Sequence, residues 1–477
     1  MGEKIPSGIP GLDDILNGGI EKGWCYLIKG GPGSGKTIFG LQFLMEGVRN
    51  GEKSVYISFD EIREEVERQA ENFRWDLSEV HFVDKVSEMD ILSTDLPFLD
   101  YESLAEIQSI INSIVELKEL KDADRVFIDG IGIIRDMVKD PAIYRRIMSS
   151  IINYFNRNKI TTMISEEFTE IGRGVTSYLT SGEFVLDKVE RNDGGILRTL
   201  DVVKFRSDYV HLGRHYFEIT PNGIVVYPII PPKISEKRRV RRLISTGSKE
   251  LDKMLDGGIY EGSTLLITGK TGVGKTNIGL QILMENDKRG EVGVLYVGDE
   301  TEDVILKRYQ ELFGYEPEKI VIREFTSHEM SLGKFYNIFT KDFEELKPTV
   351  IMVDPLNILQ RVSLSENELI RFLKILKDVT HSLGLITVAT YEVTKAADVF
   401  HFTGAGVSFF ADYLLLGRHV EIDGEIQKIL TVVKNRFGDH ERMARILNFE
   451  RGVGVRISEP LKSYTGLMGV SLTKKGN

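Results

Sequence analysis

The chain has 477 residues, of which 42% are hydrophobic and 28% charged, and 61 basic against 72 acidic residues give a formal net charge of −11. This length predicts roughly three domains or two large ones, and the composition excludes a collagen, a disordered tail protein and a disulfide mini-protein. The single cysteine, Cys25, excludes an internal disulfide and fits a reducing compartment. Without a signal-peptide pattern or an apolar run of roughly 18 residues, we expect a cytoplasmic protein with no membrane partner.

A long internal repeat organises the chain. Landmarks between Gly8 and Gly23 recur between Gly247 and Gly262, shifted by 239 residues. The same shift relates GGPGSGKT (30–37) to GKTGVGKT (269–276), and it falls to 225 where FIDG answers MVDP, at Gly130 and Pro355. Repeats of this length are too long for solenoid units, so they indicate two homologous domains in tandem.

The domain boundaries follow from a change in composition. Three prolines and a basic run near 230–243 are typical of an exposed linker. We expect a first domain over 1–232, a basic linker over 233–243, a second domain over 244–460 and a C-terminal tail over 461–477.

Short apolar runs alternate with helical patterns in each copy. The predicted strands are, in chain order, 24–30, 54–59, 125–130 and 160–165, then 264–269, 293–298, 349–354 and 385–390. Continuous apolar runs of this kind are typical of buried parallel strands, and 37–51 has the apolar stripe of an amphipathic helix. The pattern predicts α/β domains with mostly parallel central sheets, while 183–228 and 412–457 favour antiparallel strands because of their Gly-containing turns.

Two segments match the phosphate-loop pattern G-x-x-x-x-G-K-[ST]. Each follows a predicted strand and opens a helix, so backbone amides, a lysine and the helix N-terminus would hold ATP phosphates, and Thr37 and Thr276 would ligate Mg²⁺. A decayed site is the alternative, which two intact copies disfavour. The predicted nucleotide-binding residues are Gly31, Gly33, Ser34, Gly35, Lys36, Thr37 and Ile38, with Thr271, Gly272, Val273, Gly274, Lys275, Thr276 and Asn277.

Polar residues end several of the predicted strands. Asp129 and Asp354 are placed to contact Mg²⁺, unless they only cap the strands. The pairs Asp60-Glu61 and Asp299-Glu300 are candidate catalytic carboxylates that orient water, or acidic starts of the helices that follow. Ser165 and Thr390 are candidate γ-phosphate sensors, since each ends a further strand.

Lys204 with Arg206, and Lys434 with Arg436, lie two residues apart on predicted strands and so face the same side. Such a cation fork can stabilise charge on a transferring phosphoryl group; the alternative is a solvated strand face.

These motifs together resemble the KaiC family of double-domain ATPases. The likeness covers about 1–460 and is carried by PSGIPGLDDILNGGI, its echo STGSKELDKMLDGGI, the acidic pairs, ILRTLDVVKFR and FEITPNGIVVYP. The resemblance implies two tandem RecA-like domains and a homohexamer drawn as two stacked rings. It also implies nucleotides between subunits, with the two cation forks acting on the neighbouring subunit's phosphate loop.

The chain departs from the family pattern in two places. KaiC proteins carry paired glutamates where this chain has Asp60 and Asp299 first, which shortens the candidate base. They also phosphorylate an adjacent Ser and Thr in the second domain, whereas here Phe409 follows Ser408. Ser408 is therefore a candidate for single phosphorylation, with Thr403 as second choice; the alternative favoured by the sequence is a serine packed beside Phe409 and Phe410.

Three functions follow as hypotheses. The first is a KaiC-like Mg²⁺-dependent ATPase that couples slow hydrolysis to ring conformation or to an unknown signalling partner. The second is a RecA- or RadA-type ATPase acting on DNA, which the acidic balance disfavours despite the basic run at 237–242. The third is a nucleotide-gated scaffold with vestigial hydrolysis, which the shortened acids keep open.

Overall fold

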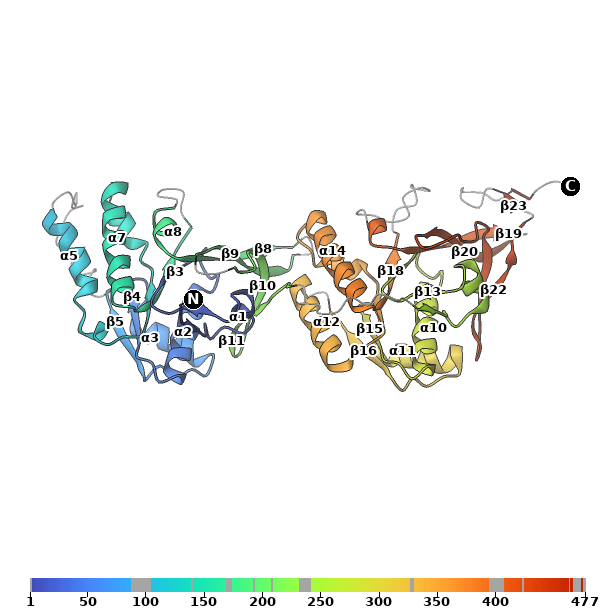
Figure 1. Cartoon of the computed structure of the whole chain (residues 1–477), viewed down its shortest axis with the longest axis horizontal. Coiled ribbons are helices and arrows are strands. Elements are labelled where there is room, and N and C mark those ends of the chain that lie inside the picture. Colours follow the sequence, from blue (N-terminus) through green and yellow to red (C-terminus); the bar gives the residue numbers. More distant parts are fainter. Residues whose placement is uncertain are drawn as a thin grey trace. The chain divides into compact units, whose positions relative to one another are not determined.

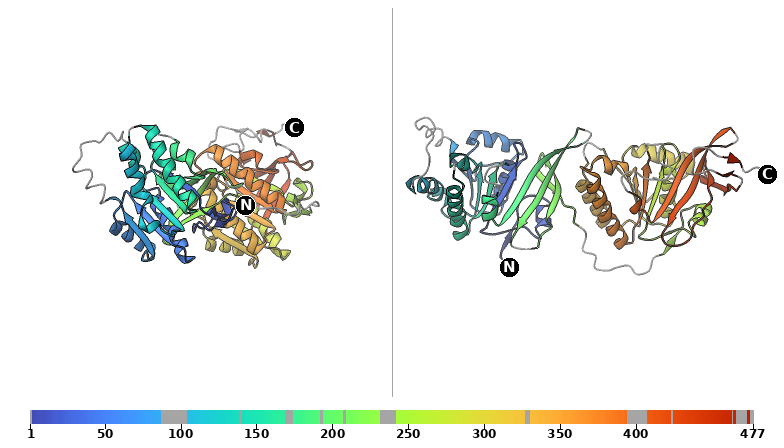
Figure 2. Two further views of the ribbon diagram at one scale, coloured as in Figure 1. Left: turned by 60° about the vertical axis from the view of Figure 1, so that its left-hand side comes forward. Right: turned by 90° about the horizontal axis from the view of Figure 1, so that it is seen from above.

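A computed structural model describes residues 2–86, 104–138, 140–168, 174–191, 194–206, 209–230, 242–326, 330–393, 407–422, 424–462, 464–465 and 473–474. The chain divides into two compact units, formed chiefly by Met1–Glu190 with Gly194–Ile230 and by Pro231–Asn477. Each unit has a central sheet between layers of helices (Figure 1, Figure 2).

The first domain is built on one long sheet. Its order within the described residues is β11 (Gly223–Tyr227), β10 (Gly213–Thr220), β9 (Ile196–Phe205), β8 (Gly182–Glu190), β3 (Cys25–Gly30), β7 (Thr161–Glu166), β6 (Arg125–Asp129), β4 (Ser54–Ser58) and β5 (Val80–Asp84). The strands from β8 to β5 pair in parallel, and β8 to β11 pair antiparallel.

Helices cover both faces of this sheet because its central strands are apolar on both sides. Helices α2 (Lys36–Arg49) and α3 (Arg63–Glu71) lie on one face, and α5 (Leu104–Val115) and α7 (Pro141–Arg157) on the other (Figure 1). Side chains alternate along β3: Tyr26 and Ile28 join the core under α2, while Cys25 and Leu27 join the core under α7. The remaining helices within the described residues are short: α1 (Leu12–Ile15), α6 (Ile133–Met137), α8 (Val175–Leu179) and η1 (Lys118–Leu120).

The second domain repeats this topology strand for strand. Its order within the described residues is β16 (Ile320–Glu324), β15 (Gly293–Val297), β17 (Val350–Asp354), β18 (Ile386–Glu392), β14 (Thr264–Gly269), β19 (Tyr413–Ile422), β20 (Glu425–Asn435), β21 (Arg445–Glu450) and β22 (Gly454–Pro460). Helices α10 (Lys275–Lys288) and α11 (Glu302–Arg308) cover one face, and α12 (Leu332–Leu346) and α14 (Glu366–Leu383) the other (Figure 1). The shorter helices are α9 (Lys249–Met254), α13 (Asn357–Arg361), η2 (Tyr309–Phe313) and η3 (Val407–Phe409).

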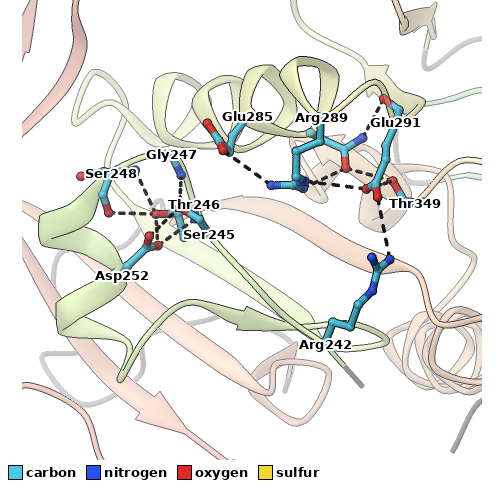
Figure 3. Close-up of polar contacts among 11 residues, drawn as sticks. Arg242, Ser245, Thr246, Gly247, Ser248, Asp252, Glu285, Arg289, Glu291 and Thr349 are labelled. Atoms are coloured by element: carbon cyan, nitrogen blue, oxygen red, sulfur yellow. Dashed lines mark hydrogen bonds and ion pairs between the residues drawn. The ribbon is translucent and has the colours of Figure 1, made fainter. Parts of the chain in front are cut away.

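An aspartate fastens the segment that opens each domain. In the second domain Asp252 accepts hydrogen bonds from the Thr246 backbone amide at 2.7 Å and from the Ser245 hydroxyl at 2.6 Å (Figure 3). In the first domain Asp13 accepts from the Ser7 amide at 3.0 Å. These contacts give a physical reason for the repeated aspartate, because the loop amides would otherwise lack partners.

The predicted fold class is confirmed, and the predicted antiparallel regions form the β8–β11 and β19–β22 ladders. The edge strands β5 and β16 were not predicted, because their sequences VHFVD and IVIRE interrupt the apolar run with polar residues. Strand β12 (Leu243–Ile244) already begins inside the predicted linker, most of which lies outside the described residues. Among the described helices, none is long and apolar enough to cross a membrane.

Candidate nucleotide sites

The first phosphate loop joins β3 to α2. Gly35 immediately precedes the helix with φ of 107°, a left-handed conformation that favours glycine. Lys36 lies over the loop, and its ammonium donates to the carbonyl oxygens of Gly30 at 3.0 Å and Gly31 at 3.2 Å. The loop is therefore folded around its own lysine, at a helix N-terminus whose free amides favour an anion.

The second loop repeats this arrangement between β14 and α10. Gly274 precedes the helix with φ of 103°, and Lys275 donates to the carbonyl oxygens of Gly269 and Lys270, each at 3.0 Å. Burial lowers the pKa of Lys275, while Glu392 and Asp354 act in the opposite direction.

Two predicted loop residues turn inward rather than toward a ligand. Ile38 packs against the core under α2, and Val273 is buried against Gly269 and Gly417. Their side chains thus support the loops, and only their backbone groups are available to phosphate. Ser34 is also buried, and its hydroxyl has no partner among the described residues.

Asp129 lies at the end of β6, at the centre of a set of hydroxyl donors. Thr37 donates to Oδ2 at 2.8 Å and Tyr56 donates to the same oxygen at 2.7 Å, while Ser165 donates to Oδ1. The Ser165 hydroxyl also accepts from the Gly130 amide at 2.9 Å. Ser165, a candidate phosphate sensor, thus contacts the candidate metal carboxylate directly.

The second domain builds a smaller version of the same set. Asp354 is hydrogen-bonded by Thr276 and by Thr390, which donates to Oδ1. Leu295 stands in β15 where Tyr56 stands in β4, so the phenol has no equivalent. Burial is the largest cause of the raised pKa of Asp354, and its two threonine hydrogen bonds act against that rise.

These residues fit Mg²⁺ as a ligand set. Each site offers one threonine hydroxyl next to one carboxylate, both hard oxygen ligands, and Mg²⁺ in such sites takes its other ligands from phosphates and water. Within the described residues there is no cluster of three or more His, Cys, Asp or Glu side chains that would hold a metal by itself.

The acidic pair of the first domain lies beside this carboxylate. Asp60 is exposed to solvent overall. Its carboxyl group nevertheless packs closely against Gly130, because a Cβ added to that glycine would lie 2.2 Å from the carboxyl carbon. Partial burial raises the pKa of Asp60, followed by the charge of Asp129. Glu61 accepts a hydrogen bond from Gln69 Nε2 at 2.7 Å, and partial burial raises its pKa as well.

The acidic pair of the second domain is held by arginines. Arg308 Nη2 lies 2.6 Å from Glu300 Oε1, and Arg361 Nη1 lies 3.4 Å from Asp299 Oδ1. The other carboxylate oxygen of Glu300 is buried without a hydrogen-bond partner in the described residues.

A cavity of about 420 Å³ joins these features in the second domain. It is lined by the loop, the candidate metal ligands and the acidic pair, including Gly272, Lys275, Thr276, Asn277, Asp299, Glu300, Arg308, Asp354 and Thr390. Eight of the predicted loop and strand-end positions thus meet the acidic pair in one volume, as a bound triphosphate requires.

Among the described residues, each cation fork contacts backbone carbonyls, joined in the second domain by a carboxylate, rather than the phosphate loop of its own domain. Lys204 donates to the carbonyl oxygens of Ser177 and Thr180, and Arg206 to that of Tyr178 at 2.8 Å. In the second domain Lys434 donates to the carbonyl of Ala411 at 2.7 Å, and Arg436 lies 3.4 Å from Asp412. Neither Lys434 nor Arg436 lines the cavity.

Ser408 lies in η3 with its side chain exposed, and its carbonyl accepts from Lys434 at 3.1 Å. The packing alternative that the sequence favours for Ser408 is therefore wrong: Val407 and Phe410 on either side are buried, and Ser408 is not. Thr403 lies outside the described residues.

Sequence reasoning missed Tyr56, Gln69, Arg308 and Arg361. Gln69 and Arg308 share the shift of 239 residues and both stand eight residues after an acid of the pair, but their side chains differ, so repeat comparison gave no signal. Only the helix geometry of α3 and α11 brings them back to the acids.

The chain contains two RecA-like domains, each with a mostly parallel sheet and a phosphate loop, and is therefore a tandem P-loop ATPase. The ATPase family described as KaiC matches residues 5–230 and 244–462. The chain therefore belongs to the KaiC family of ATPases.

Several curated relatives extend over nearly its whole length. "Circadian clock protein KaiC3" of Synechocystis sp. is 29% identical over 488 residues, which cover 98% of this chain and 94% of that protein. "Circadian clock oscillator protein KaiC" of Prochlorococcus marinus subsp. pastoris is 28% identical, covering 93% of this chain and 88% of the relative. The protein of the same name from Picosynechococcus sp. is 25% identical over 99% of this chain and 93% of its own length.

Proposed function

We propose that the chain binds Mg-ATP in both domains, between the subunits of a homohexamer, and couples slow hydrolysis to ring conformation or to binding of a signalling partner. The observation that carries this proposal is the paired Thr37–Asp129 and Thr276–Asp354 contact beside each phosphate loop. Mg²⁺ held there would neutralise phosphate charge during transfer.

Different residues of the chain have different roles in the reaction. The loop amides with Lys36 or Lys275 bind the phosphates, and Asp129 or Asp354 orients its threonine. In each acidic pair the second acid accepts a hydrogen bond from Gln69 or Arg308, and the first acid is the more exposed of the two. Asp299 keeps this exposure although Arg361 lies 3.4 Å from it. Asp60 and Asp299 are therefore the residues that accept a proton from, or orient, the attacking water.

Phosphate release by single-site variants tests this function. Wild-type protein, Lys36→Ala, Lys275→Ala and the double variant are compared at saturating Mg-ATP. We expect each single variant to keep part of the turnover and the double variant to lose it. Turnover that survives in the double variant would overturn the assignment, and light scattering at six times the 54.0 kDa chain mass tests the hexamer.

The forks are proposed to act on the neighbouring subunit. The support is that Lys434 and Arg436 lie outside the cavity of their own domain, while the family resemblance implies an inter-subunit role. Burial lowers the pKa of Lys204 and of Lys434, with a neighbouring arginine as the next cause in each case.

The DNA-dependent and scaffold alternatives make different predictions. A DNA-dependent ATPase would be stimulated by single-stranded DNA, and the acidic chain argues against this. Arg242, the described end of the basic run, is already paired with Glu261 at 2.7 Å. A scaffold with vestigial hydrolysis would bind ATP tightly with turnover unchanged by Asp60→Asn or Asp299→Asn.

Autophosphorylation at Ser408 is a second proposed activity, favoured by the exposure of that side chain. Intact mass before and after incubation with Mg-ATP tests it, with Lys275→Ala as the control. A phosphate adduct in the wild type that is absent from the control and maps to Ser408 supports the activity. An unchanged mass with ATP bound overturns it.

A further inference from the structure

The two acidic pairs occupy equivalent positions but different electrostatic surroundings. Gln69 and Arg308 are equivalent residues, related by the shift of 239, and each donates a hydrogen bond to the second acid of its pair. The first domain thus presents a neutral amide to Glu61, and the second presents a guanidinium charge to Glu300.

Arg361 adds a second positive charge in the second domain. It lies 3.4 Å from Asp299, whereas the equivalent residue of the first domain, related by the shift of 225, is the acidic Asp136. Asp136 pairs with its neighbour Arg135 at 3.7 Å. Within the described ranges, no cation forms an ion pair with Asp60 or Glu61, whereas both acids of the second pair have one.

Several other charges around the two loops have counterparts in both domains. Each site has one candidate metal carboxylate, one loop lysine and one glutamate at the end of the neighbouring strand or just after it, Glu392 or Glu167. Each loop also has two further cations at its rim: Lys188 and Arg198 beside Gly33 in the first domain, and Lys270 and Lys428 in the second. The two arginines at the acidic pair of the second site are positive charges that the acidic pair of the first site lacks.

This difference would act on a triphosphate bound in the cavity, because Arg308 lines the same cavity as Lys275 and Asp354. ATP carries several negative charges, and a site rich in carboxylates repels it unless a divalent cation intervenes. Guanidinium groups beside the acids supply part of that compensation from the protein itself.

We propose that Arg308, assisted by Arg361, lets the second site retain ATP without its divalent cation, whereas the first site holds ATP only together with the cation. The inference rests on the proposed function, since it assumes that both loops bind nucleotide. It assigns to Arg308 a positioning and specificity role: the residue sets which form of the nucleotide, metal-bound or free, its site accepts.

Binding of a fluorescent ATP analogue to full-length protein tests the proposal. Lys275→Ala disables the second site and so serves as the first-site background, while Lys36→Ala disables the first site and serves as the second-site background. Each variant is titrated with the analogue in Mg²⁺ and in excess chelator. We expect chelation to weaken binding at the first site at least about tenfold more than at the second, as two nearby charges would produce.

Reciprocal exchanges then identify the residue. Arg308→Gln in the second-site background is expected to enlarge the chelator effect toward that of the first site, and Gln69→Arg in the first-site background to reduce it. Arg308→Lys keeps the charge and is expected to keep the tolerance. Arg456→Gln is the matched control, because it removes an exposed guanidinium that pairs with Glu450 at 2.9 Å, away from the cavity residues.

The outcomes separate the two proposals. Equal chelator effects at the two sites, or an unchanged effect in Arg308→Gln that still binds Mg-ATP, overturn the role of Arg308 while the ATPase function stands. Failure of either site to bind the analogue in Mg²⁺ overturns the proposed function and this inference with it.

Discussion

Tyr56 donates a hydrogen bond of 2.7 Å from its phenol to Oδ2 of Asp129, the carboxylate at the end of the neighbouring strand. The phenol is fully buried, and burial raises its pKa well above the usual value, with the charge of Asp129 as the next cause. Tyr56 therefore stays protonated and donates its hydrogen bond at every physiological pH. It holds Asp129 in one orientation, a constraint that Asp354 lacks because Leu295 replaces the tyrosine.

Tyr56→Phe is expected to lower the Mg²⁺ affinity of the first site, so that half-maximal turnover requires more Mg²⁺. The carboxylate loses one of its three hydroxyl donors, and loss of such an outer contact typically costs about tenfold or more in metal affinity or activity. The measurement is the Mg²⁺ concentration for half-maximal turnover in the Lys275→Ala background. Tyr26→Phe is the control, since that hydroxyl contacts Glu21 instead. Identical Mg²⁺ curves for both variants would contradict the role of Tyr56.

Gly130→Ala is expected to lower first-site turnover by about 10- to 100-fold while ATP binding persists. An added Cβ would fall 2.2 Å from the carboxyl carbon of Asp60 and displace it, and φ at this glycine is +75°. Gly51→Ala is a matched control, because its φ is +73° but nothing lies within 4 Å of the added carbon. Equal turnover in the two variants would show that the position of Asp60 is unimportant.

Asp60→Asn is expected to stabilise the first domain while slowing its turnover. The folded pKa of Asp60 is raised above the ordinary 3.8, so ionising this carboxyl costs stability at neutral pH. That cost disappears as pH falls through the folded pKa toward the unfolded one, because the group is then protonated in both states. We expect a gain in Tm of about 1–3 °C at pH 8 that shrinks as the pH falls through the folded pKa of Asp60.

Thermal unfolding at several pH values checks this expectation. Glu79→Gln, which changes an exposed carboxylate outside the site, serves as the control and is expected to leave Tm nearly unchanged. A gain for Asp60→Asn that grows toward acidic pH would have the wrong sign and refute the argument.

Mixed rings are expected to recover activity if the forks act between subunits. Lys275→Ala and Arg436→Gln each disable the second site, and both are made in the Lys36→Ala background. When the two are co-expressed, about a quarter of head-to-tail interfaces combine an intact loop with an intact arginine. Turnover near that fraction supports action between subunits, and turnover no higher than in either variant alone argues that Arg436 serves its own chain.

Several features of the sites could be predicted from local sequence. A phosphate loop is a contiguous motif whose glycines, lysine and threonine act through nearby backbone, so eight residues suffice to define it. Asp129 and Asp354 were predictable because an aspartate after a buried parallel strand must emerge at the same sheet edge as the loop.

The partners of the acidic pairs could not be predicted in this way. Gln69 and Arg308 reach the acids only because α3 and α11 fold back over the strand ends, and no spacing rule distinguishes them from other exposed helical residues. Ile38 and Val273 fit the motif by position, yet their side chains turn into the core.

The sequence by itself determined the duplication, the α/β class and the two phosphate loops, because each is encoded by periodicity or by a contiguous motif. Only the tertiary structure decided that the two sites differ in charge. Tyr56, Gln69, Arg308 and Arg361 act across distances of many residues, and their electrostatic effect depends on which carboxylate each one meets in space. Such contacts arise when strand order and helix packing bring distant residues together. Because the two domains share the same strand order, comparing their repeated sequences does not reveal which side chains meet in each one.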